Sequence, residues 1–188
     1  MPGAYQVRLT ANGRTLTEPL EVRGDPRLSA TPDALAAQLA LSLRIRDLLT
    51  ETHQAIAQLR TVRDQVTDTL RRAKQKGGDE KVRAAGEALA AKLTKVEEAL
   101  YQTKNQSSQD PLNYPIRLNN KLAALGGVVA SGDQAPTAQA GEVFAELSGR
   151  IRAELDTLAA ALATDLPAFN ALAGDEHVPA VSVPAPRR

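Results

Sequence analysis

Apolar and polar residues alternate along the first part of the chain, on both sides of an Asn12-Gly13 step. The alternating apolar positions are Tyr5, Val7, Leu9, Leu16, Leu20 and Val22. Asn-Gly between two alternating runs is the strongest short-range signal for a β-hairpin, because both central residues of a type I′ turn need positive φ. The pattern predicts a hairpin over residues 3–23. Its predicted facing pairs are Leu9 with Leu16, Tyr5 with Leu20, and Val7 with Glu18.

A lone hairpin leaves one apolar face to be covered, because two strands are only marginally stable in water. The rest of the sequence has no alternating pattern that could extend the sheet. We therefore expect the chain to be a fragment that begins inside a β-domain. The apolar face of the hairpin is expected to dock on the helices, or to pair edge to edge or face to face with a second copy, which gives a possible homodimer through the exposed hairpin. Any such dimer is expected to be a consequence of truncation. Residues 24–31 form the predicted linker.

From residue 32 onward the apolar period changes to about 3.5 residues, which is typical of long, closely packed helices. The predicted helices cover residues 32–76, 79–100, 116–130 and 136–166, and residues 169–172 add a turn after Pro167. The predicted stripe of the first helix is Ile45, Leu49, Thr52, Ile56, Leu59, Arg63, Val66 and Leu70, widened by Leu48, Ala55 and Val62.

The short Gly77-Gly78 connection predicts that the first two helices form a long antiparallel helical hairpin. The expected fold is therefore mainly α, with an antiparallel four-helix bundle over residues 32–172. The β-hairpin precedes this bundle, and residues 173–188, which hold several prolines, are expected to be a flexible tail.

Composition excludes several classes of function. The 188 residues include no Cys, which excludes thiol catalysis, disulfides and thiolate metal sites. The net charge of +1 provides no field that would attract nucleic acid. The sequence has no apolar run of about 18 residues, so we expect no membrane insertion.

The carboxylates do not form a catalytic pattern. Glu97-Glu98 and Asp79-Glu80 are interpreted as solvated helix charges, and no acidic residue is expected to face inward. General acid–base catalysis needs carboxylates whose surroundings separate their pKa values. The sequence offers no such pair, so we predict no catalytic residue and no enzyme activity for this fragment.

The two histidines are also expected to be inert. His53 is placed on the flank of the first helix, next to the stripe residue Thr52. His177 follows Asp175 and Glu176 in the proline-rich tail, where no scaffold would hold the three side chains around an ion. We therefore predict no metal site and no cofactor.

The most distinctive local sequence is the loop and helix start between Asp110 and Lys121. Its candidate interaction residues are Asn113, Tyr114, Arg117, Asn119, Asn120 and Lys121. One interpretation is that these groups cap helix ends and lock the loop against the bundle. The other is a recognition surface, because polar loops on rigid scaffolds often carry binding. We favour the first interpretation, and the second stays open.

Residues 112–122, followed by Gly132-Asp133-Gln134-Ala135-Pro136-Thr137 and by residues 144–147, resemble the C-terminal end of large bacterial proteins. Those proteins carry sortilin-like or BNR (Asp-box) repeat β-propellers and are often labelled glycosyl hydrolases. Residues 2–9 with Asp25-Pro26-Arg27 look like the last hairpin of the Ig-like or fibronectin-like domain before that tail. The propeller repeat Ser-x-Asp-x-Gly-x-Thr-Trp is absent, so no propeller residue and no hydrolase activity carry over to this fragment.

The resemblance implies a noncatalytic accessory C-terminal module of a secreted or cell-envelope protein, with a structural or protein-interaction role. Its implied partners are the upstream domains of the parent, and a protein or glycan ligand stays unidentified. Two alternatives are kept. The module is a tail that shapes or gates the active site of a glycan hydrolase parent, or it is a self-associating coiled-coil adaptor.

Overall fold

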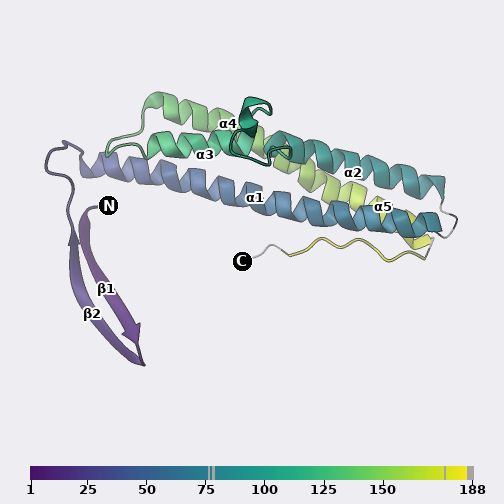
Figure 1. The fold of residues 1–188 in the computed structure, drawn as a ribbon, viewed down its shortest axis with the longest axis horizontal. Coiled ribbons are helices and arrows are strands. Elements are labelled where there is room, and N and C mark those ends of the chain that lie inside the picture. The colour runs from purple at the N-terminus through teal and green to yellow at the C-terminus, as the bar shows by residue number, and fades with distance from the viewer. Residues whose placement is uncertain (76, 78, 176, 186–188) are drawn as a thin grey trace.

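The computed structural model describes residues 1–75, 77, 79–175 and 177–185, and it is mainly helical with a two-stranded antiparallel sheet (Figure 1). The strands are β1 Gly3–Ala11 and β2 Arg14–Val22. The helical elements are α1 Pro32–Gln75, α2 Glu80–Leu100, the 3₁₀ turn η1 Asp110–Leu112, α3 Leu118–Val129, α4 Ala138–Ala160, the π-helical turn η2 Ala161–Asp165, and α5 Leu166–Asp175.

The β-hairpin forms in the predicted register. Asn12 and Gly13 have φ values of 51° and 74°, as a type I′ turn requires. Leu9 pairs with Leu16, Tyr5 with Leu20, and Val7 with Glu18. The hairpin projects from one end of the helices, with its turn pointing away from them (Figure 1). All its residues are exposed, so the expected docking of its apolar face on the helices is wrong.

α1 is the longest element, and its buried stripe runs along most of its length. The buried positions are Leu41, Ile45, Leu48, Thr52, Ile56, Leu59, Val62, Val66, Thr69 and Ala73. Leu48 and Val62, predicted at the margin, are fully buried, whereas Leu49 and Arg63 are half-buried. The stripe is shifted because α1 packs against helices on two sides. The predicted end at Lys76 and the turn residue Gly78 lie outside the described residues.

α2 runs antiparallel to α1, as predicted. Its first turn is capped by Asp79, whose side chain accepts a hydrogen bond from the Lys81 amide at 2.8 Å. Close packing is possible at Gly86, where an added Cβ would lie 2.6 Å from Leu70 and 2.8 Å from Phe169. The predicted inward residues Leu89 and Leu93 are buried.

The helices lie in three rods. α2 and α3 follow one another along α1, since α1 contacts α2 through Arg60 and Arg63 and contacts α3 through Gln38 and His53. α4 and α5 form the third rod (Figure 1). At any point along α1, therefore, three helices pack together, whereas the sequence predicts a bundle of four. The reason is length, because a helix of 44 residues is longer than α2 and α3, of 21 and 12 residues, placed end to end.

The third rod passes through Pro167 without ending. The sequence predicts a helix that stops at Leu166, yet helical structure continues from Ala138 to Asp175. Proline lacks the N–H group that an α-helix needs, and its ring collides with the carbonyl four residues earlier. The π-helical turn just before Pro167 adjusts the backbone there, and the Leu166 amide donates to the Ala161 carbonyl five residues back.

The segment expected to be a flexible tail lies extended along α1 over residues 177–185 (Figure 1). Val178 and Val181 are buried in the core. The Asn170 side chain bonds both backbone groups of Val181, at 2.9 and 2.8 Å, and Gln65 does the same for Ser182, at 3.0 Å each. These paired amide contacts replace the strand partner that an extended backbone otherwise needs.

Leu59 of α1 and Leu93 of α2 are fully buried, as the sequence predicts. Replacing either with alanine should lower the free energy of unfolding by roughly 2–5 kcal/mol, because each change leaves a cavity in the core. Urea unfolding followed by circular dichroism measures this loss. Leu112→Ala is the control, since that side chain is 85% exposed. Equal stability of the Leu59, Leu93 and Leu112 variants would contradict the packing described above.

Candidate functional site

The predicted interaction residues do not converge on one site. Asn119 is buried in the first turn of α3, and its Nδ2 lies 3.3 Å from Nε2 of His53 on α1. Tyr114 is partly exposed beneath Lys104, whose Nζ lies 5.8 Å from the ring centre. Asn113, Arg117, Asn120 and Lys121 are exposed as well. Whether they bind a ligand stays a prediction.

Arg117 and Lys121 share an open hollow of about 330 Å³ with Arg150 and Glu154 of α4. Arg117 occupies the N-cap position of α3 and supplies no capping hydrogen bond from its side chain. The hollow thus combines three cations with one carboxylate. This mixed lining specifies no particular ligand.

The crossover loop is held by residues outside the predicted set. Gln102 is buried and donates from Nε2 to the Pro115 carbonyl at 2.8 Å. Asp110 accepts hydrogen bonds from the amides of Gln106 and Ser107 and from the Ser107 hydroxyl. These bonds, the one from Gln106 first, hold the pKa of Asp110 below its ordinary value. Ser107 three residues before Asp110 is the sequence signal for this turn.

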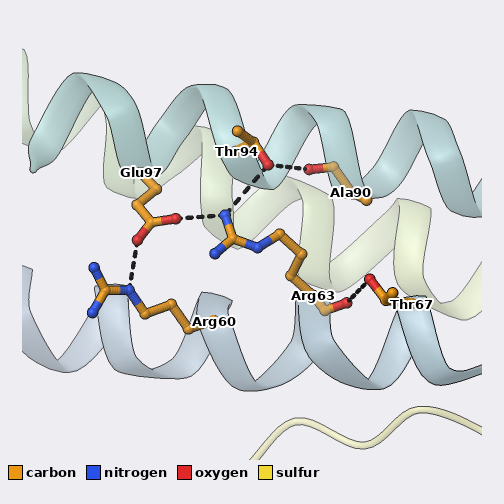
Figure 2. Close-up of polar contacts among 6 residues, drawn as sticks. All are labelled: Arg60, Arg63, Thr67, Ala90, Thr94 and Glu97. Atoms are coloured by element: carbon orange, nitrogen blue, oxygen red, sulfur yellow. Dashed lines mark hydrogen bonds and ion pairs between the residues drawn. The ribbon is translucent and has the colours of Figure 1, made fainter. Parts of the chain in front are cut away.

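An ion-pair cluster around the buried Glu97 carboxylate joins α1 to α2, and the sequence did not predict it (Figure 2). Glu97 is 2% exposed, so the prediction that it is a solvated charge, and that no acid faces inward, is wrong. One carboxylate oxygen accepts from Arg60 Nε and the other from Arg63 Nη1, each at 2.5 Å. Thr94 Oγ1 also accepts from Arg63, at 3.3 Å, and donates to the Ala90 carbonyl at 2.9 Å.

The spacing of these residues explains the cluster. Arg60 and Arg63 are one turn apart and therefore lie on the same side of α1, facing α2. Arg60 also stacks over the ring of Tyr101, 5.1 Å from its centre. An arginine inside the predicted apolar stripe, Arg63, was the available signal, because a cation there needs an acid on the facing helix. The Glu97 carboxylate points at α1, so the cluster fixes the alignment of two helices.

The histidines and carboxylates of the described residues form no group of three or more that could hold a metal ion. His53 is exposed on the flank of α1, as predicted, and adds the contact to Asn119. Glu176, named with Asp175 and His177 as a cluster in the tail, lies outside the described residues. None of the described helices has the length and apolar character needed to cross a membrane.

The apolar face of the β-hairpin is exposed to solvent. Its side chains are between 40% and 66% exposed: Tyr5, Val7, Leu9, Leu16, Leu20 and Val22. The two most exposed, Leu9 and Leu16, face each other across the strands near the turn. Soluble monomers rarely expose apolar patches larger than a few hundred Å², and such patches often mark interaction sites.

Comparison of the chain with protein-family models, with curated proteins and with solved structures gives no match.

Glu97→Gln should lower the free energy of unfolding by about 2–3 kcal/mol, because it removes charge-assisted hydrogen bonds to Arg60 and Arg63. The matched control is Glu98→Gln, which changes the neighbouring, exposed carboxylate and should stay within about 0.5 kcal/mol of the unchanged chain. Chemical denaturation checks both. Loss of stability in the Glu98 variant alone would mean that the neighbouring carboxylate, and not Glu97, joins the helices.

Proposed function

We propose that the chain is a noncatalytic accessory module with a structural and protein-interaction role. The packed helices together, called the helical rod from here on, act as a rigid support. The β-hairpin at the end of this helical rod is the contact element. The observation that carries the proposal is the exposed apolar face of the hairpin, centred on Leu9 and Leu16.

The contrast between the two parts of the molecule supports this division. The apolar stripes of α1, α2, α3 and α4 are buried against one another and form one core. On the described α-helices the exposed large apolar side chains are Leu39, Leu43, Val128 and Val143, spread over three helices, whereas the hairpin gathers six on one face. Association through the hairpin is therefore favoured over a coiled-coil adaptor. The hairpin has no such cover and presents its apolar side chains to solvent.

The arrangement of charged groups supports the noncatalytic part of the proposal. The buried carboxylate of Glu97 is held by two arginines and is turned toward α1. In the part of the chain that is described, the remaining carboxylates do not gather with histidines around a common centre. Such an arrangement uses the buried carboxylate to join two helices and leaves it engaged by both arginines.

The resemblance noted for residues 112–122 leads us to place the module outside the cytoplasm, in a secreted or cell-envelope protein with repeat β-propellers. On that resemblance the hairpin would belong to an Ig-like or fibronectin-like domain of the parent protein, and its contact would be with that domain or with a second copy. A tail that shapes a glycan hydrolase site is the second reading of the same resemblance. The contact made by the hairpin distinguishes these possibilities.

A photo-crosslinking residue at position 16, on the apolar face, should give protein adducts when the chain is produced in bacteria. The same residue at position 8, on the opposite face, is the control and should give far fewer, because Arg8 points away from that face. Peptide mass mapping of the adducts identifies the partner and the contact. A second copy and an upstream β-domain would both support an interaction role.

Equal crosslinking from positions 8 and 16 would contradict the hairpin as contact element. The noncatalytic part has its own test. The purified chain should turn over none of a panel of aryl-glycosides and peptides, and turnover that a point substitution within residues 33–172 abolishes would overturn it.

A further inference from the structure

We propose that the apolar face of the hairpin binds a second copy of the same chain, face to face and antiparallel. This inference rests on the proposed function, because it names the partner of the same surface. Edge-to-edge pairing of strands would add backbone hydrogen bonds but would leave the apolar side chains in water. Face-to-face packing removes them from water, which is the dominant favourable term in association.

The charged residues on this face match those of a second, antiparallel copy. On β2, Arg14 and Glu18 lie on the same face as Leu16 and flank it by two residues on either side. The two charges are about 13 Å apart along the strand, too far to pair with each other. In the described part of the chain neither makes an ion pair. Consider a two-fold axis that passes between the two apolar faces at the level of Leu16 and runs perpendicular to the strands. This axis places each Glu18 against Arg14 of the other copy.

The side chains on β1 also fit those of the second copy when the same two-fold axis is applied. Leu9 is paired with Leu16, so the axis brings Leu9 of the two copies together. Val7 then meets Ala11 of the other copy, a larger side chain against a smaller one. In an isologous interface residue i contacts residue j and residue j contacts residue i, and both pairs obey this rule.

The antiparallel arrangement places the helices of the two copies at opposite ends of the paired hairpins. The base of each hairpin joins its helices, and its turn points away from them (Figure 1). Copies related by this axis therefore carry their helical rods in opposite directions. Tyr5, Leu20 and Val22, nearer the base, are the less exposed members of the face, at 40–46%. Tyr5 and Leu20 then face the turn of the other copy at the edge of the overlap, and Val22 lies outside it.

The overlap is small, which sets the strength of the dimer. Val7, Leu9 and Leu16 with Ala11 and the aliphatic stems of the two charged residues cover much less than the roughly 800 Å² per partner of a standard-size interface. Interfaces that bury less than about 1,200 Å² in total belong to weak, reversible complexes. The dimer should therefore form in the micromolar to low-millimolar range and weaken as salt screens the two ion pairs.

Sedimentation equilibrium of the full chain and its charge variants tests the proposal. Arg14→Glu places acids against acids and Glu18→Arg places cations against cations, so each variant alone should dimerise at least about tenfold more weakly. An equimolar mixture of the two variants should associate about as well as the unchanged chain, because every contact then joins opposite charges. Arg8→Glu on the opposite face is the matched control and should behave as the unchanged chain does.

Circular dichroism establishes that each variant is folded, and exposed side chains at these positions make that outcome expected. Dimerisation that is unaffected by either single substitution, or that the mixture fails to restore, would overturn the proposed alignment. A chain that stays monomeric up to millimolar concentration would overturn the second copy as partner. Crosslinks from position 16 to a different protein would then still support the interaction role.

Discussion

The fold depends on one long helix being covered along its length. An isolated helix is marginal in water, and most helical stability in proteins comes from packing an apolar face. α1 receives that packing from α2 and α3 in turn and from α4, and the extended C-terminal segment adds further contacts through Gln65. The hairpin takes no part in this coverage. The molecule therefore consists of a helical rod with its own core and a hairpin that stands apart.

The cluster around Glu97 aligns α1 with α2 near the middle of the rod (Figure 2). Buried ion pairs contribute little net stability compared with apolar packing, but removing one partner is costly. Arg60 and Arg63 can both reach the Glu97 carboxylate in only one register of α2 against α1. A shift of α2 by one residue would turn the Glu97 side chain away from α1. The same alignment leaves the rest of α1 free for α3.

Local signals made the elements predictable, whereas contacts between elements were not. Asn12-Gly13 specifies the hairpin and its register, and the apolar period specifies the helices. The centre of the α1 stripe depends on which helices flank it, so Leu48 and Val62 were placed at its margin. Glu97 was missed because its burial depends on two arginines from another helix. Of the candidate loop residues, Asn119 is buried against α1 as a locking contact, Tyr114 lies under Lys104, and the others lie on the surface.

The division between rod and hairpin is the central claim, and deleting residues 1–24 tests it most directly. The shortened chain should keep its helical circular dichroism, and its free energy of unfolding should stay within about 0.5 kcal/mol of the full chain, because exposed segments away from the core contribute little. Loss of helical structure, or a much lower unfolding free energy, would show that the hairpin belongs to the core of the rod and would contradict the account.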